Sequence, residues 1–124
     1  MSKHIHTDKA PAAIGPYVQA TETEQLVFVS GQLGIDMSTG EMPEDVSEQA
    51  RCSMANLGAI LAEAGLKPEN VLKTTIFLTD MAYFADVNKV YADFFGEHYP
   101  ARSCIAVCAL PKGAKVEVEC IAQK

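Results

Sequence analysis

The sequence has no run of basic residues, no apolar stretch approaching the length of a membrane span, and no apolar core behind its first residues, "MSKHIH". Its 10 Lys and Arg are scattered and outnumbered by 16 Asp and Glu, which gives a net charge of −6. Phosphate binding needs a basic patch, so this balance argues against nucleic acid as the main partner. Without a secretory signal or a span, we expect a cytoplasmic protein that does not enter a membrane.

The sequence also lacks the patterns of a disulfide framework, a metal site or a phosphate loop. The chain has four cysteines, Cys52, Cys104, Cys108 and Cys120. They show no C-x-x-C spacing, which favours free thiols in a reducing compartment. His4 and His6 alternate without a third ligand, so we expect no metal there. "SGQLG" (30–34) lacks the lysine and the spacing of a phosphate loop.

The composition is that of an ordinary globular protein. Of 124 residues, 48% are apolar and 21% charged. A chain of this length buries about two-thirds of its unfolded surface. No internal repeat or low-complexity linker interrupts the sequence, so residues 1–124 are expected to form a single domain.

The first half of the chain predicts short strands followed by a helix. "HIH" (4–6) is a candidate strand, and residues 17–21 and 26–32 flank a polar turn as in a β-hairpin. Asp45 and Glu48 have the spacing of a capping box. Apolar residues then recur at helical spacing until Gly65, which predicts a long first helix.

The second half predicts a strand, a helix and two more strands. Residues 71–80 are rich in β-branched side chains. Asp80 can cap a second helix, which has an apolar stripe of Phe84, Val87, Tyr91 and Phe94 and ends before Gly96. Residues 103–110 and 115–122 predict the last two strands, joined as a hairpin through "PKG" (111–113). Two helices that link strands by right-handed crossovers lie on one face of a mixed sheet, which predicts a two-layer α+β sandwich.

The sheet face that the helices leave uncovered is expected to be apolar. Ile105 and Val107 point to one side of their predicted strand, and Phe77 alternates with Ile76 and Leu78. An exposed apolar face of that size is rare in a monomer. The sequence therefore predicts a homo-oligomer.

Arg102 stands at the start of a predicted strand, and its charge needs a partner. It can form a structural salt bridge at a subunit interface, for which Glu117 or Glu119 would serve, or bind a small carboxylate with its guanidinium fork. Glu117 and Glu119 share one face of the last strand, about 6–7 Å apart. They belong to a solvated face or, if that strand pairs with the strand from Ser103, one lies near Arg102 as a base or water-orienting group.

The other candidates have plain structural explanations. Cys104 shares a face with Arg102, but no histidine is placed to activate it, so we interpret it as a packing or rim residue whose backbone matters more than its sulfur. Asn88 is compatible with a helix surface and Ser30–Gly31 with a strand end. Tyr17 is compatible with an ordinary strand aromatic.

Several segments together resemble the reactive intermediate deaminases of the RidA/YjgF family. They are "APAAIGPYVQA", "VFVSGQLGID", "TGEMPEDVSEQAR", "NLGAILAEAGL", "VLKTTIFLTDMAYFADVNKVYADFF", "PARSCIAV" and "LPKGAKVEVECIA". The resemblance implies a chorismate-mutase-like fold, assembled as a homotrimer with clefts between subunits. It implies hydrolysis of 2-aminoacrylate/2-iminopropanoate and 2-iminobutanoate to 2-oxo acids and ammonia, without a cofactor or metal.

The resemblance also assigns roles to individual positions. Arg102 matches the arginine that binds the substrate carboxylate, Glu117 the residue that positions the attacking water, and Cys104 a residue whose backbone orients substrate. Four more positions match residues that line the cleft: Tyr17, Ser30, Gly31 and Asn88. The segment "GEHYPARS" (96–103) is shorter than in similar proteins, which affects the loop leading to Arg102.

Two other functions remain open at the level of sequence. A non-catalytic module could use the same arginine cleft to sense small carboxylates or 2-oxo acids. The pairing of Arg102 with Glu117 favours the enzyme, because a pure anion binder has no use for a carboxylate. An RNA-acting or chaperone-like protein is the third possibility, and the acidic balance argues against the RNA-acting form.

Overall fold

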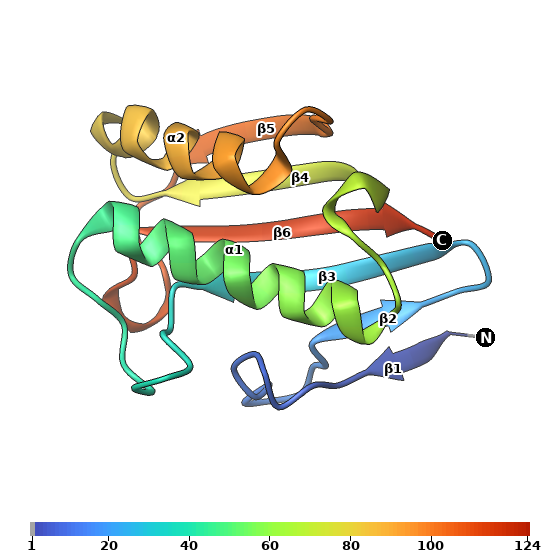
Figure 1. Cartoon of the computed structure of the whole chain (residues 1–124). Coiled ribbons are helices and arrows are strands. Elements are labelled where there is room, and N and C mark those ends of the chain that lie inside the picture. The colour runs from blue at the N-terminus through green and yellow to red at the C-terminus, as the bar shows by residue number, and fades with distance from the viewer. Residues whose placement is uncertain (1) are drawn as a thin grey trace.

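The computed structural model describes residues 2–124, and Figure 1 shows its course. The elements, in chain order, are β1 (Lys3–Ile5), β2 (Ala20–Glu22), β3 (Leu26–Leu33), α1 (Val46–Glu63), β4 (Val71–Leu78), α2 (Phe84–Phe95), β5 (Ala101–Ala106) and β6 (Val116–Gln123). Within the described residues, no helix is long and apolar enough to cross a membrane.

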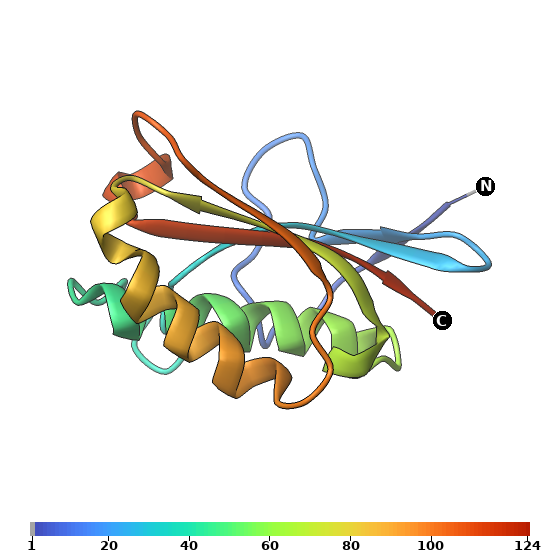
Figure 2. The same cartoon turned by 90° about the horizontal axis from the view of Figure 1, so that it is seen from above.

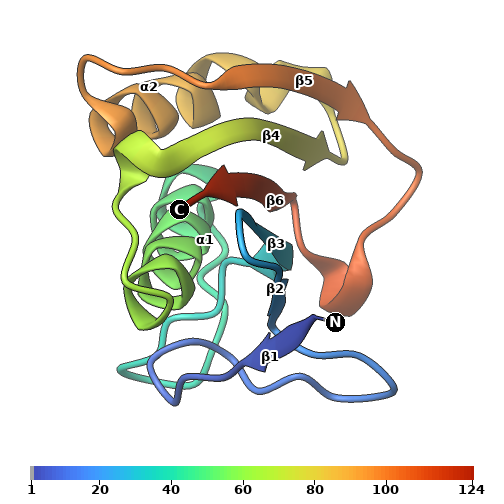
Figure 3. The ribbon, with the colours of Figure 1, turned by 90° about the vertical axis from the view of Figure 1, so that its right-hand side faces the viewer.

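The strands form one mixed sheet in the order β1-β2-β3-β6-β4-β5. Every neighbouring pair is antiparallel except β4 and β5, which run parallel. Both helices lie on one side of this sheet, as Figure 2 shows, and Figure 3 shows the strands stacked from β5 to β1. The predicted α+β arrangement, with one mixed sheet and two helices on a single face, is confirmed.

The predicted hairpin between the last two strands is wrong. β4 lies between β5 and β6 and pairs with both. Because β5 runs parallel to β4, both strands end at the same edge of the sheet, and the chain passes over the end of β4 to begin β6. Hydrogen bonds from Val107 N to Leu78 O (2.7 Å) and from Thr79 N to Lys115 O (3.1 Å) fix that passage.

The "PKG" segment forms a short 3₁₀ turn in this passage, with Lys112 at a positive φ of 58°. A turn-forming tripeptide is compatible with either connection, since turn residues do not specify which strand the chain meets next. The tripeptide therefore predicted a reversal correctly and the strand pairing incorrectly.

The helices begin where the capping residues predict, with one difference. The Asp45 side chain accepts a hydrogen bond from Glu48 N (3.1 Å) at the start of α1. The Asp80 side chain accepts one from Ala82 N (2.8 Å), but this bond caps a 3₁₀ turn at Met81–Tyr83, and α2 begins only at Phe84. Asp80 therefore starts the helical segment, not α2 itself.

Two strand boundaries also differ from the predictions. β2 begins at Ala20, because the chain around Tyr17 forms a turn and leaves the ladder. β5 begins at Ala101 and ends at Ala106, so residues 107–110 belong to the passage towards β6.

The core lies between the helices and the sheet. Its largest fully buried side chains include Leu57, Ile60 and Leu61 of α1, Ile76 and Leu78 of β4, and Val116 and Val118 of β6. Burying each of these contributes about 1.5–3 kcal/mol. Gly58 lets α1 approach α2, because a Cβ there would lie 3.2 Å from the Phe94 ring.

The other face of the sheet has no helix over it and carries apolar side chains, as predicted. Phe28 is 41% exposed and Ile105 is 47% exposed. Phe77 and Ile121 share this face and are only partly buried. We call this surface the open face. Segments before β2 and after β5 rise beside it (Figure 2).

Candidate active site

Arg102 lies on the helix-facing side of the edge strand β5. It pairs in register with Thr74 of β4, which is fully buried and faces α2. The guanidinium Nη1 donates a hydrogen bond to Asn88 Oδ1 at 2.7 Å. Its Cζ lies 4.9 Å from the centroid of the Tyr91 ring and 5.4 Å from that of Phe84. Within residues 2–124, Arg102 makes no ion pair.

A depression of about 350 Å³ opens beside this guanidinium, between α2 and the loop that leads into β5. It is lined by Asn88, Tyr91, Ala92, Tyr99, Pro100 and Arg102. Tyr99 belongs to the short loop noted in the sequence and is 62% exposed. The arginine is therefore accessible and its charge is uncompensated within the described chain.

Cys104 follows Arg102 on the same side of β5 and packs against the core. Burial raises the pKa of its thiol, and the charge of Arg102 only partly opposes this effect. A thiol with a raised pKa is a poor nucleophile at neutral pH. The structure therefore agrees with the interpretation of Cys104 as a packing residue.

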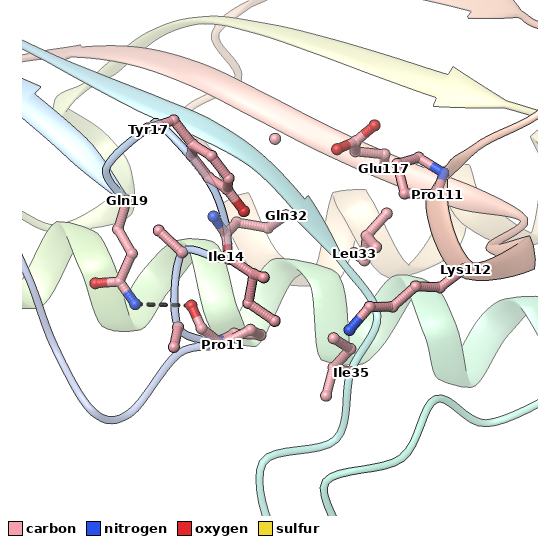
Figure 4. Close-up of a pocket in the computed structure, with 13 residues that line it drawn as sticks. Pro11, Ile14, Tyr17, Gln19, Gln32, Leu33, Ile35, Pro111, Lys112 and Glu117 are labelled. Atoms are coloured by element: carbon pink, nitrogen blue, oxygen red, sulfur yellow. Dashed lines mark hydrogen bonds between the residues drawn. The ribbon is translucent and has the colours of Figure 1, made fainter.

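Glu117 lies on the open face, on the opposite side of the sheet from Arg102. It alternates with Val116 and Val118, which are buried beneath the helices, and it pairs with Phe77 of β4. The carboxylate lines a pocket of about 500 Å³, shown in Figure 4. Its pKa is raised above 4.5, first by burial and second by the nearby charge of Glu119.

The pocket on the open face is mostly apolar, and two loops form its walls. Figure 4 shows Ile14 and Tyr17 entering from one side and Pro111 and Lys112 from the other, with Leu33 and Ile35 below. A half-buried carboxylate among apolar side chains is well placed to hold one water molecule and accept a proton from it.

Gly31 fits so closely against the Glu117 carboxylate that a side chain at position 31 would force the carboxylate to move. A Cβ at this position would lie 2.4 Å from Glu117 Oε2. The ladder between β3 and β6 shifts register between Val29 and Gln32, which places Gly31 in a bulge. Bulges often occur next to active sites, where they redirect the chain.

Ser30 and Gln19 hold the loop that carries Tyr17. Ser30 Oγ donates to Val18 O at 2.7 Å. The buried Gln19 side chain donates to Pro11 O at 2.8 Å (Figure 4) and accepts from Thr7 N at 2.7 Å. Tyr17 follows a turn at Gly15, whose φ is 122°, and is 52% exposed. The hydrogen bond from Ser30 therefore holds the main chain at Val18, next to Tyr17.

The structure divides the seven candidate residues between two faces of one sheet. Arg102, Cys104 and Asn88 gather on the helix-facing side. Tyr17, Ser30, Gly31 and Glu117 gather on or beside the open face. The sequence placed a glutamate of the same chain near Arg102 only if β5 paired directly with β6. These two strands do not pair, because β4 lies between them.

Sequence reasoning missed two residues that contact Arg102. Phe84 and Tyr91 were interpreted only as members of the apolar stripe of the second helix. The signal was present, because Phe84, Asn88 and Tyr91 follow the i, i+4, i+7 spacing that places side chains on one side of a helix. Gln19 was also missed, and no pattern in the sequence marked it.

The described residues, 2–124, contain no group of three or more His, Cys, Asp or Glu side chains that could hold a metal ion. His6 Nε2 lies 2.9 Å from Asp8 Oδ1 at the surface. All four cysteines are free.

Comparison with known proteins gives close matches over nearly the whole chain. Residues 7–124 match the family model described as Endoribonuclease L-PSP. A 2-iminobutanoate/2-iminopropanoate deaminase of Salmonella typhimurium is 52% identical over 125 residues, which is 98% of either chain. The crystal structure of Escherichia coli TdcF with bound serine has a TM-score of 0.95 at 49% identity, over 98% of both chains. RidA from an Antarctic Psychrobacter has a TM-score of 0.94 at 43% identity, over 98% of this chain and 99% of that one.

Proposed function

This chain belongs to the RidA/YjgF family of reactive intermediate deaminases, and from that premise we propose the reaction of its site. It hydrolyses 2-aminoacrylate/2-iminopropanoate and 2-iminobutanoate to 2-oxo acids and ammonia. The observation that carries this proposal is Arg102, a partly exposed guanidinium that lines a depression, is held only by neutral groups and is thus able to receive a substrate carboxylate. The serine bound in the related TdcF structure, an amino acid with a carboxylate, supports a ligand of this class.

In the first step, the Arg102 fork binds the carboxylate of the imine. The guanidinium binds the substrate carboxylate through two parallel hydrogen bonds. This bidentate contact fixes both the position and the orientation of the substrate. Holding the substrate still beside the water supplies much of the rate advantage, because an imine already hydrolyses readily in water.

In the second step, Glu117 directs a water molecule at C2 of the imine. The carboxylate accepts a proton from the water as the new C–O bond forms and the C=N bond becomes a single bond. The same proton then moves to nitrogen, which gives a tetrahedral intermediate that carries a hydroxyl and an amino group on C2. Glu117 passes the hydroxyl proton to the amino nitrogen as the C–N bond breaks and the C=O bond forms, so ammonia leaves and a 2-oxo acid remains. One imine and one water give one 2-oxo acid and one ammonia, so no oxidant, reductant or cofactor is needed.

We further propose that two copies of the chain complete each site. Arg102 and Glu117 lie on opposite faces of the same sheet, so the Arg102 side of one copy must meet the open face of another. The exposed Phe28 and Ile105 support such a contact, because they are apolar and have no helix over them. A chorismate-mutase-like homotrimer, as the family resemblance implies, provides three such sites in a closed ring.

The test couples the protein to a threonine dehydratase and follows the rate of 2-oxobutanoate formation, with the spontaneous rate subtracted. Arg102→Ala is expected to lower the acceleration by about 100-fold, as for a lost charge-assisted bidentate contact. Arg51→Ala is the matched control, because Arg51 is an exposed arginine paired with Glu48 on α1.

An Arg102→Ala protein that accelerates the reaction as well as the original would overturn the proposal. Saturable binding of 2-oxobutanoate with no acceleration by the unaltered protein would instead favour the sensing module. The family resemblance implies that these substrates are released by pyridoxal-phosphate enzymes such as threonine dehydratase, so we place the protein with them in the cytoplasm and propose neither nucleic acid nor a membrane as a partner.

A further inference from the structure

Three side chains of α2 surround the Arg102 guanidinium, and we call them the arginine cradle: Phe84, Asn88 and Tyr91. Their i, i+4, i+7 spacing places them on one side of the helix. Two rings lie within 5.4 Å of Arg102 Cζ, and the Asn88 amide oxygen accepts its Nη1–H. The guanidinium is therefore held on several sides by one element.

The cradle is anchored to the core. Tyr91 is only 4% exposed, and its hydroxyl forms a 2.7 Å hydrogen bond with the fully buried Thr74 of β4. Its ring also packs against Phe95, with 4.7 Å between ring centroids. A ring held at its edge by packing and at its hydroxyl by a hydrogen bond cannot rotate freely. The surface beneath Arg102 is consequently rigid.

Each member of the cradle is electrically neutral. An aromatic face attracts a guanidinium and an amide oxygen accepts its proton, but neither cancels its charge. A carboxylate in the place of Asn88 would hold the side chain more strongly and would also compete with an incoming anion. The chain uses the weaker, neutral contacts at the one arginine that the proposed reaction needs.

We propose that Phe84, Asn88 and Tyr91 are positioning residues that fix the Arg102 fork while leaving its full charge for the ligand carboxylate. The inference rests on the proposed function, in which Arg102 binds that carboxylate. The cradle lowers the conformational entropy that Arg102 loses on binding, because the side chain is already ordered before the ligand arrives.

The first test compares Tyr91→Leu with Tyr91→Phe by titration of 2-oxobutanoate, the stable product. Tyr91→Leu removes the ring, and the Kd is expected to rise about tenfold, within the range for a cation–π contact. Tyr91→Phe keeps the ring and is expected to stay within about twofold. Phe94→Leu is the control, because Phe94 packs against Gly58 of α1 on another side of the helix.

A purely structural role would lower thermal stability in both Tyr91 variants without this difference in Kd. Equal Kd values for Tyr91→Leu and the original protein would therefore overturn the inference. The same titration in an Arg102→Ala background distinguishes direct from indirect action. If Tyr91 acts through Arg102, Tyr91→Leu causes no further loss there.

The second variant, Asn88→Asp, keeps the shape of an exposed side chain and so tests the inference without a folding risk. The new carboxylate would lie 2.7 Å from Arg102 Nη1 if nothing moves. Its ion pair is expected to raise the Kd for 2-oxobutanoate at least about tenfold and to raise KM with little change in kcat. Undiminished affinity in Asn88→Asp would contradict the requirement for a neutral cradle.

The two proposals fail in different ways. If Arg102→Ala changes neither the Kd for 2-oxobutanoate nor the acceleration, the proposed function itself is wrong. If Arg102→Ala abolishes both while Tyr91→Leu and Asn88→Asp bind normally, only the cradle is wrong.

Discussion

The two sides of this sheet hold charge in opposite ways. On the helix-facing side, a permanent cation rests on two rings and an amide, and it remains accessible. On the open face, a carboxylate is half-buried in an apolar pocket that raises its pKa. The first arrangement preserves a charge for an anion, and the second makes a carboxylate better at taking a proton. A single chain holds both groups but keeps the sheet between them.

The largest expected effect comes from removing Glu117, the proposed proton acceptor on the open face. Glu117→Gln keeps the shape of the side chain and is expected to lower the acceleration of 2-oxobutanoate formation by about 100-fold, the usual range for a general base. Glu119→Gln, two residues along the same face, is the control and retains most of the activity.

The pH dependence sharpens this prediction. Because burial raises the pKa of Glu117 above 4.5, the carboxyl becomes protonated at a higher pH than a free glutamate. Activity that needs the ionised form is present above that raised pKa and is lost as the pH falls through it. A Glu117→Gln protein that keeps the original rate and acid limb would show that another group accepts the proton.

The second prediction tests whether the two sides meet in different copies. Arg102→Ala and Glu117→Gln are each expected to be nearly inactive. Mixed, unfolded together and refolded, they should recover about a quarter of the original acceleration, because half of the copies keep the arginine and half of their neighbours keep the glutamate. No recovery, with mixed assemblies demonstrated by mass spectrometry, would place both groups of each site in one copy.

The third prediction concerns the bulge that lies against Glu117. In Gly31→Ala, the new Cβ would meet Glu117 Oε2 at 2.4 Å, so the carboxylate must move. We expect about a tenfold loss of activity with little change in stability, because the displaced group is the end of a flexible side chain. Gly40→Ala is a useful comparison for stability, because no atom lies within 4 Å of its Cβ but its φ of 79° is strained. A Gly31→Ala protein of full activity would show that the position of Glu117 is not critical.

The smallest effect is expected for Cys104. Its thiol has a raised pKa and packs against the core, so Cys104→Ala should cost about 1 kcal/mol of stability and less than about tenfold in activity. The main chain, which the family resemblance links to substrate orientation, is unchanged. Thermal unfolding and the coupled assay measure the two effects, and a loss as large as that of Glu117→Gln would indicate that the sulfur takes part in the chemistry.

Local patterns predicted the elements of this fold well. The Asp45 cap, the apolar spacing of α1 and the stop at Gly65 all depend on residues a few positions apart, and α1 formed as expected. The pairing of β5 with β4 depends on contacts between distant segments, and the "PKG" turn carried no information about it. The sheet order, and with it the separation of Arg102 from Glu117, required the structure.

The same distinction applies to the candidate site. Arg102 was identifiable, because a charged residue at the start of an apolar strand calls for an explanation. Phe84 and Tyr91, which contact Arg102, were not identifiable as site residues, because they have the spacing of ordinary core residues. Gln19 was equally hidden, since its hydrogen bonds reach the main chain of a loop about ten residues away.

The proposed completion of each site by a neighbouring copy, across the sheet that separates Arg102 from Glu117, would make turnover depend on the abundance of the protein itself. If neighbouring copies complete each other's sites, dilution below the dissociation constant of the assembly removes the activity of every chain without unfolding any of them. At low protein concentrations, total turnover then rises more steeply than the amount of protein. A cell would gain full protection from reactive imines only after its stock of this protein passed a threshold.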